Sequence, residues 1–195
     1  QTYKIVGTTD VDLNTRTVLI VDDTLQSQSY YDLSGDHVVF SEGYGMTWDP
    51  IAQAIVYAKK TLSVNNYKTG SNNELMDNVQ TYKIVGTTDV NLNDRTVTIV
   101  DDTLQSQSYY DLSGDHVVFS EGYGMIWDTA TSTVILGKKT LSVNNYKVGS
   151  NNELMDNVQT YKIVGTTDVN LATRTVSIVD DTLQSQSYYD LSGDH

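Results

Sequence analysis

Apolar and polar residues alternate with a period of two along most of the chain, which is the pattern of half-buried β-strands. Runs rich in Val, Ile, Thr and Tyr are separated by clusters of Gly, Asn, Asp and Ser, a composition typical of strands and tight connections. The strands predicted on this basis are Tyr3 to Val6, Thr17 to Val21, Val38 to Phe40 continuing toward Trp48, and Ala54 to Val64.

Two hairpin tips are expected, near Asp12 to Thr15 and near Asp49 to Gln53. Each is a polar loop that begins with Asp and lies between two apolar runs, and Asp side chains readily accept hydrogen bonds from the backbone of such turns. After the second tip, apolar residues from Ile55 to Ala58 occupy both faces of the strand. We therefore expect both faces to be at least partly covered.

One short segment favours a helical turn. Residues 73–79 read NELMDNV, and Asn72 or Asn73 is a suitable N-terminal cap. No longer stretch shows helical periodicity, so we predict an all-β protein of antiparallel, β-sandwich-like repeats or stacked β-sheets.

The chain repeats itself with a period of 79 residues. The segment QTYKIVGTTDV begins at Gln1, Gln80 and Gln159, so the predicted repeats are 1–79, 80–158 and a partial third copy, 159–195. An alternative frame is a partial repeat 1–37 followed by 38–116 and 117–195. Because the copies are nearly identical, we expect them to fold alike. The chain begins with Gln rather than Met, so we expect an excerpt of a longer array.

Most differences between the two full copies fall between Thr47 and Ala58. There DPIAQAIVYAKK in the first copy becomes DTATSTVILGKK in the second. An exposed hairpin tip tolerates such replacement.

Composition narrows the classes of partner. Twelve Lys plus Arg against 25 Asp plus Glu give a net charge of -13, so nucleic acid is not an expected partner. No apolar window is long enough for a membrane helix, and membrane insertion is not expected. The chain holds no Cys, which excludes disulfides and thiolate metal sites.

The acidic residues raise the question of a calcium site. Asp10 with Asp12, or Asp22 with Asp23, are the candidate oxygen ligands, because Ca²⁺ prefers carboxylate and carbonyl oxygens. The alternative is a structural role at strand ends, which suits Asp10, Asp12, Asp32, Asp36 and Asp49. The chain lacks the known calcium-loop patterns, and whether it binds a metal stays open.

Catalysis is not expected. His37, His116 and His195 occupy one position in three copies, each within Ser-Gly-Asp-His. Ser34, Asp36 and His37 contain the residue types of a catalytic triad, but sequence neighbours rarely reach triad geometry. We predict no catalytic residue, no cofactor-binding residue and no cofactor.

The aromatic residues offer a candidate binding surface. Tyr30, Tyr31, Tyr44, Trp48 and Tyr67 are suited to stacking on sugar rings. The alternative, which we favour, is cross-strand packing.

Residues 24–31, TLQSQSYY, are polar, uncharged and strand-prone, and such a segment pairs readily at a sheet edge. The flanking Asp22, Asp23 and Asp32 act as gatekeepers against uncontrolled pairing. The lysines Lys4, Lys59, Lys60 and Lys68 leave open an internal isopeptide bond to Asn.

Near-identical, acidic, Cys-free and Thr/Asn/Asp-rich tandem units resemble the repeat regions of prokaryotic cell-surface proteins, such as adhesin stalks, sheaths and extracellular filaments. The resemblance implies a secreted or cell-surface, β-rich, structural protein whose partner is itself. We therefore predict an extracellular protein whose repeats assemble through strand-edge pairing. The alternative is a repeated adhesin domain that binds glycans or surfaces through loops such as Asp49 to Gln53, with or without calcium.

Overall fold

The structure is a computed structural model that describes residues 1–4, 9–12, 14–20, 24–84, 89–99, 103–150, 153–163, 168–178 and 182–190. These residues form strands, turns and bends, and none of them is helical. The predicted all-β class is confirmed. In this part of the chain, no helix is of the length and apolarity needed to cross a membrane.

The described residues contain sixteen strands, and their bounds follow the repeated sequence. They are β1 (Thr2–Lys4), β2 (Thr9–Asp12), β3 (Thr17–Ile20), β4 (Thr24–Tyr31), β5 (Val38–Asp49), β6 (Ala54–Tyr67), β7 (Met76–Lys83), β8 (Asp89–Asn91), β9 (Thr96–Thr98), β10 (Thr103–Tyr110), β11 (Val117–Asp128), β12 (Thr133–Tyr146), β13 (Met155–Lys162), β14 (Asp168–Asn170), β15 (Thr175–Ser177) and β16 (Thr182–Tyr188).

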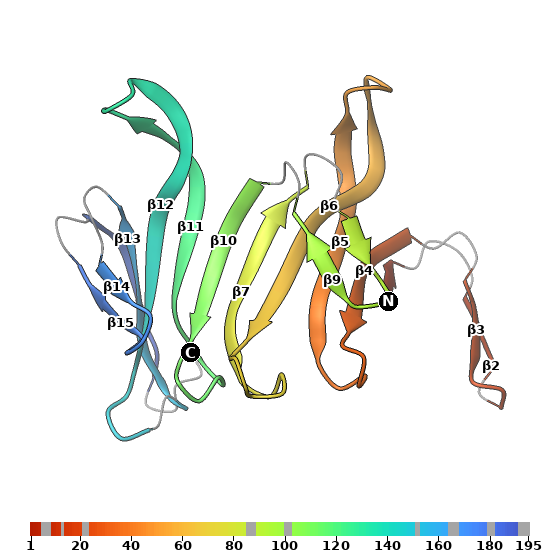
Figure 1. Ribbon diagram of the computed structural model, residues 1–195, viewed down its shortest axis with the longest axis horizontal. Helices are drawn as coiled ribbons and strands as arrows, with labels where there is room; N and C mark the ends of the chain where they lie inside the picture. The colour runs from red at the N-terminus through yellow and green to blue at the C-terminus, as the bar shows by residue number, and fades with distance from the viewer. Residues whose placement is uncertain are drawn as a thin grey trace. The chain divides into compact units, whose positions relative to one another are not determined.

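Ten of these strands belong to a large antiparallel sheet, and six form two-stranded hairpins, β2–β3, β8–β9 and β14–β15. The chain divides into two compact units. Unit 1 holds residues 1–64 and 83–103, and unit 2 holds residues 65–82 and 104–195. The sheet strands of unit 1 follow the order β1-β4-β5-β6, and those of unit 2 the order β7-β10-β11-β12-β13-β16 (Figure 1).

The predicted strands are found where they fall on described residues. The runs from Thr17, Val38 and Ala54 become β3, β5 and β6, and β6 continues to Tyr67. Tyr3 lies in β1, whereas Ile5, Val6 and Val21 lie outside the described residues.

Both predicted hairpin tips are confirmed, and an Asp side chain organises each. Asp12 Oδ1 accepts hydrogen bonds from the amides of Asn14 and Thr15, at 2.9 and 3.2 Å. Asp49 Oδ1 accepts them from Ile51 and Ala52, at 2.8 and 3.1 Å. These bonds are the Asx-turn geometry expected of Asp at such positions.

The predicted helical turn at residues 73–79 is wrong. Asn72 and Asn73 adopt left-handed backbone conformations with φ of 53° and 63°, which ends any right-handed helix there. The chain instead turns back and continues as β7. Asn tolerates this conformation better than most residues do, so the same residue type served as a misleading cap signal.

The core lies on one face of the sheet. In unit 1 it consists of Phe40 and Leu62, which belong to the paired strands β5 and β6. In unit 2 it consists of Tyr109, Phe119 and Leu141, from β10, β11 and β12. Tyr109 and Phe119 are ring neighbours, with centroids 4.7 Å apart. So small a core on a single sheet needs a covering layer.

The prediction that both faces of the second hairpin are at least partly covered holds for one face only, because Val56 and Ala58 are half-buried whereas Ile55 and Tyr57 are exposed. Trp48 and Ile55 are cross-strand partners in β5 and β6, and they are 60% and 68% exposed. The register explains this, because β4 pairs with β5 only as far as Gly43. Residues beyond that point form a projecting arm, and β11 and β12 form its counterpart in unit 2 (Figure 1).

Each long hairpin bends at a glycine. The register between β11 and β12 shifts at Gly122, and a Cβ built there would lie 2.4 Å from Thr140 Oγ1. Gly43 and Thr61 form the same contact in unit 1. The close approach of the threonine side chain therefore requires glycine at this bulge.

We expect Gly122→Ala to lower the free energy of unfolding by about 1–3 kcal/mol, because the added methyl group overpacks the bulge. Gly124→Ala is the matched control, since its Cβ would meet only the flexible Lys139 side chain, at 3.2 Å. Chemical denaturation measures both effects. Equal stability of the two variants would contradict this account.

Candidate functional site

A buried carboxylate is the most unusual feature of the sheet face. Glu121 alternates with Phe119 along β11, so both side chains lie on the core face, and Glu121 is 2% exposed. Lys138 Nζ donates to its Oε1 at 2.5 Å, and the Tyr123 hydroxyl donates to Oε2 at 2.8 Å. These donors compensate the carboxylate for the water it has lost.

Unit 1 contains the same cluster. Glu42 is 2% exposed, Lys59 Nζ lies 2.5 Å from its Oε1, and the hydroxyls of Tyr30 and Tyr44 donate to Oε2 at 3.2 and 2.9 Å. Each lysine is partly exposed, so it reaches the carboxylate from the solvent side. In both units a lysine and a tyrosine therefore satisfy the two oxygens of the buried carboxylate.

The hairpin β14–β15 covers this face in unit 2. Val169 of β14 and Val176 of β15 pack against the core formed by Tyr109, Phe119 and Leu141. A cavity of about 340 Å³ remains beside Val176, also lined by Phe119, Val143 and Tyr146. We call a hairpin of this kind, together with the arginine at its tip, a lid.

The tip arginine of this lid is bound by two side chains of the sheet. The Arg174 guanidinium forms an ion pair with Asp77, and it lies over the Tyr109 ring with its Cζ 5.8 Å from the centroid. The Arg174 side chain is 7% exposed. An ion pair combined with a cation–π contact holds the lid on the sheet.

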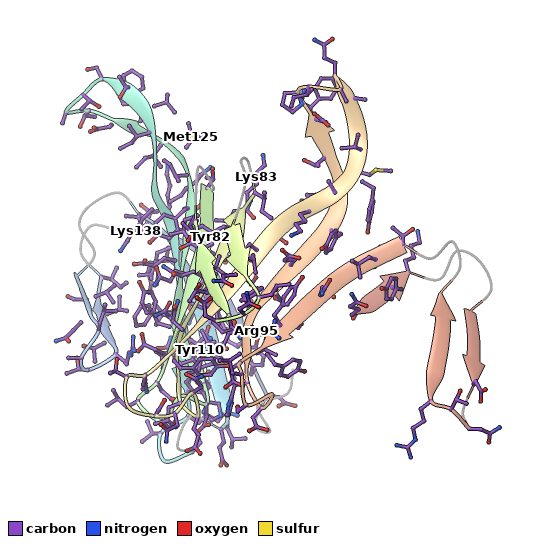
Figure 2. All side chains as sticks on the ribbon, turned by 45° about the vertical axis from the view of Figure 1, so that its right-hand side comes forward. Tyr82, Lys83, Arg95, Tyr110, Met125 and Lys138 are labelled. Carbon is purple, nitrogen blue, oxygen red and sulfur yellow. The ribbon has the colours of Figure 1, made fainter. Side chains whose placement is uncertain are left out.

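The hairpin β8–β9 has the equivalent arginine in unit 1. Arg95, labelled in Figure 2, precedes β9, and its Nε is buried. Its charge acts on Tyr30, where it lowers the pKa and opposes the larger upward effects of burial and Glu42. The pairs Arg95 with Tyr30 and Arg174 with Tyr109 therefore match.

Burial on this face raises the pKa values of two tyrosines, Tyr109 and Tyr123. Burial, and then the nearby Glu121, raise the pKa of Tyr109 to about 12, although Arg174 opposes the shift. Burial and the hydrogen bond to Glu121 raise the pKa of Tyr123 above its ordinary range. Both hydroxyls therefore stay protonated and serve as donors.

The structure gives the Ser-Gly-Asp-His segment a turn role. Asp32 Oδ1 accepts hydrogen bonds from the Ser34 hydroxyl at 2.6 Å and the Gly35 amide at 2.9 Å, and its Oδ2 lies 3.3 Å from His37 Nδ1. Asp111 forms the same turn in the second copy. Ser34 thus serves the turn through its bond to Asp32. His195 lies outside the described residues.

Of the candidate calcium ligands, Asp10 lies in β2 and Asp12 is its last residue. Asp12 accepts hydrogen bonds from its own hairpin tip, and the backbone donors of Thr15 and Asn14 lower the pKa of Asp12. Asp22 and Asp23 lie outside the described residues. In the part of the chain that is described, no three acidic or histidine side chains are grouped to hold a metal ion. Calcium binding stays a hypothesis.

The aromatic residues do not form one platform. Tyr30 and Tyr44 meet at Glu42, whereas Trp48 lies on the projecting arm and Tyr67 is at the opposite end of β6. Met125 marks the second arm in Figure 2, with Lys138 on the return strand. Exposed aromatic surface is therefore confined to the arms and edges.

Two of the four lysines considered for an isopeptide bond, Lys59 and Lys68, have other partners. Lys59 bonds to Glu42, and Lys68 Nζ donates to the carbonyls of Asp111 and Leu112, at 2.6 and 2.5 Å. Neither bond is to an Asn side chain.

Sequence reasoning missed the arginines. The chain holds three, Arg16, Arg95 and Arg174, one at the same position of each copy. No local signal marks them, because nearly every residue recurs at the same position in these copies and the partner of Arg174, Asp77, lies 97 positions away.

Comparisons with known proteins identify no family. No family model and no curated protein matches the chain. A crystal structure of a protein with unknown function from Bacteroides fragilis NCTC 9343 superposes with a TM-score of 0.32 at 15% identity, covering 87% of this chain and 96% of that chain. A likeness at this TM-score carries no argument about fold or function.

We expect the stability of the protein to fall at alkaline pH because of Tyr109. Its pKa of about 12 in the folded state exceeds the value of about 10 in an unfolded chain. Its contribution is therefore fully present below pH of about 10 and is lost as the pH rises toward 12. Denaturation midpoints measured from pH 8 to 12 should fall less steeply for Tyr109→Phe than for the wild type.

Tyr188→Phe is the matched control, because Tyr188 occupies the same position in the third copy and is 70% exposed. This variant should keep the wild-type pH dependence. An alkaline loss that is the same in wild type and Tyr109→Phe would contradict the assignment.

Proposed function

We propose that the protein is an extracellular structural protein whose near-identical β-repeats assemble into a filament, sheath or stalk through strand-edge pairing. One observation supports this most directly. The segment TLQSQSY forms β4, β10 and β16. β4 lies between β1 and β5, β10 lies between β7 and β11, and β16 pairs with β13.

The residues of this segment are suited to strand pairing. In β10 the serines Ser106 and Ser108 face Gly122 and Ser120 across the pair with β11. The matching residues in β16 are Ser185 and Ser187, and the strand carries no charged side chain. Natural strands that must avoid pairing usually carry charges, so an uncharged strand of this kind favours pairing between units.

The proposal also includes the division of the chain into 79-residue repeats. We infer that the 79-residue period of the sequence is also the period of the fold, because the Glu42 and Glu121 clusters are equivalent. The division into 1–79, 80–158 and 159–195, or the frame that begins at 38, describes the unit that is repeated. The cell-surface location follows from the resemblance in composition, and the protein performs no catalysis in this proposal.

A second candidate function is a repeated adhesin domain. It is favoured by the projecting arms, on which Trp48 and Trp127 are 60% and 62% exposed. Such side chains suit recognition of glycans or surfaces, and repetition of the arm would provide avidity. The tip residues beside Trp48 differ between copies, which suits variation of a binding loop.

Electron microscopy with light scattering, on the purified chain with Ca²⁺ and with chelator, tests the leading proposal. We expect ordered assemblies. The double variant Ser185→Lys/Ser187→Lys should raise the concentration needed for assembly about tenfold or more, because each charge placed at a paired edge costs about 1 kcal/mol. Thr129→Lys/Ser132→Lys is the matched control, since it adds the same charge at an exposed hairpin tip.

Assembly of the edge variant at the wild-type concentration would overturn edge pairing. Monomers under every condition would overturn the structural proposal, and glycan binding that Trp48→Ala/Trp127→Ala abolishes would then favour the adhesin. Loss of assembly in chelator would assign the Asp residues to metal binding.

A further inference from the structure

The arginine of the lid in unit 2 carries an unpaired hydrogen-bond donor. Arg174 pairs with Asp77 through Nη2, but its Nε is buried and has no hydrogen-bond partner among the described residues. The Arg174 side chain is only 7% exposed. Nε of Arg95, one period earlier in the sequence, is likewise buried without a partner. A buried donor without a partner costs free energy, and a bound molecule that accepts from Nε would remove this cost.

This donor belongs to the wall of the cavity between the lid and the sheet. Arg174, Thr175 and Val176 line the cavity from the lid, and residues of β11 and β12 line it from the sheet. All of them belong to unit 2. The cavity volume is about 340 Å³, at the lower end of the range of about 300–1,000 Å³ found for small-molecule sites. A compound with one small ring is therefore of suitable size.

Two side-chain amides add acceptors to this wall. Asn144 Nδ2 donates to the Val117 carbonyl at 2.8 Å, and Asn145 Nδ2 donates to the side chains of Asn157 and Gln159 at 2.9 and 3.2 Å. The Oδ1 atoms of the two lining asparagines take part in none of these bonds. A ligand that accepts from the arginine and donates to these oxygens needs hydroxyl groups, because a hydroxyl both donates and accepts.

Much of the remaining wall is apolar. Phe119, Val143 and Val176 contribute hydrocarbon surface, and Tyr146 contributes an aromatic ring. The Tyr146 hydroxyl donates to the Val117 carbonyl at 2.7 Å, and burial raises the pKa of Tyr146, so its side chain stays neutral. Apolar walls beside a few hydrogen-bonding groups suit a molecule that has both a C–H face and hydroxyl groups.

The charges around the cavity disfavour an anionic ligand. The positive charge of Arg174 is already paired with Asp77, and the chain has a net charge of -13. A carboxylate has no proton to donate to the amide oxygens of Asn144 and Asn145. A neutral ligand therefore fits this wall better than an acid does.

We propose that the cavity beneath the lid β14–β15 binds one neutral sugar unit. A sugar oxygen accepts from Arg174 Nε, sugar hydroxyls donate to Asn144 and Asn145, and the C–H face of the ring lies against the apolar wall. The site uses neither of the exposed tryptophans of the arms, and it does not depend on self-assembly. A free sugar and the terminal unit of a glycan share this chemistry, and the experiment distinguishes them.

Hydrogen exchange measured by mass spectrometry tests the proposal on the full chain. The sequence RTVSI occurs only at residues 174–178, so a peptide that contains it reports this lid alone. The probes are glucose, galactose and N-acetylglucosamine, each as the free sugar and as its methyl glycoside, with butyrate as the anionic comparison. A sugar at about ten times its dissociation constant should slow exchange in the lid about tenfold, because it stabilises the closed lid.

The glycosides identify the source of the sugar. Slowing by a free sugar but not by its methyl glycoside would assign the site to free sugars. Slowing by both would assign it to the terminal unit of a glycan, because the methyl group stands for the linkage to the next unit. Either result supports the proposed chemistry.

Variants decide whether the effect arises in the cavity. Arg174→Lys keeps a cation for Asp77 but removes Nε, and Val176→Phe fills the cavity with a ring, so both should lose the slowing by sugar. Arg16→Lys, the same exchange at an exposed arginine, is the matched control and should keep it.

Three results would overturn the proposal. They are lid exchange that none of these sugars slows, slowing by butyrate alone, and slowing by sugar that both Arg174→Lys and Val176→Phe retain. None of these results concerns edge pairing, which electron microscopy of Ser185→Lys/Ser187→Lys tests separately.

Discussion

The structure depends on covering one apolar face of an antiparallel sheet. Each long hairpin presents a Phe and a Leu on that face, Phe40 with Leu62 and Phe119 with Leu141, and these four side chains are almost fully buried. A sheet that buries so few residues gains little from its own layer, so a second layer is needed. In unit 2 that layer is the hairpin β14–β15, which comes from the third sequence copy. The layer over this face is thus supplied by a hairpin that follows it in the chain.

The positions of the charged side chains follow from the same need to cover the apolar face of the sheet. An acidic chain can bury a carboxylate such as Glu121 only beside donors, and Lys138 with Tyr123 provide them. Arg174 of the lid lies over the ring of Tyr109 and pairs with the partly exposed carboxylate of Asp77. Apolar packing buries surface area between the hairpin β14–β15 and the sheet, and the ion pair between Arg174 and Asp77 fixes the position of the hairpin.

Much of the fold was predictable from local pattern. Alternation located β3, β5 and β6, and Asp12 and Asp49 marked the tips because their turn chemistry is local. The prediction of a helical turn at residues 73–79 was wrong because Asn caps helices well and also adopts left-handed backbone conformations readily. The exposure of Trp48 could not be predicted, since it depends on where β4 stops pairing with β5. The pairing of Arg174 with Asp77 joins residues 97 positions apart, and no local pattern encodes it.

We expect the hairpin β14–β15 to stabilise the sheet face that carries Tyr109, Phe119 and Leu141. Native-state hydrogen exchange on the wild type and on Arg174→Glu tests it most directly, because exchange reports local opening residue by residue. The account predicts that the substitution speeds exchange in β10, β11 and β12, around Tyr109, Phe119 and Leu141, while the amides around Phe40 and Leu62 keep their protection. Unchanged protection in β10 to β12, or an equal loss around Phe40, would contradict it.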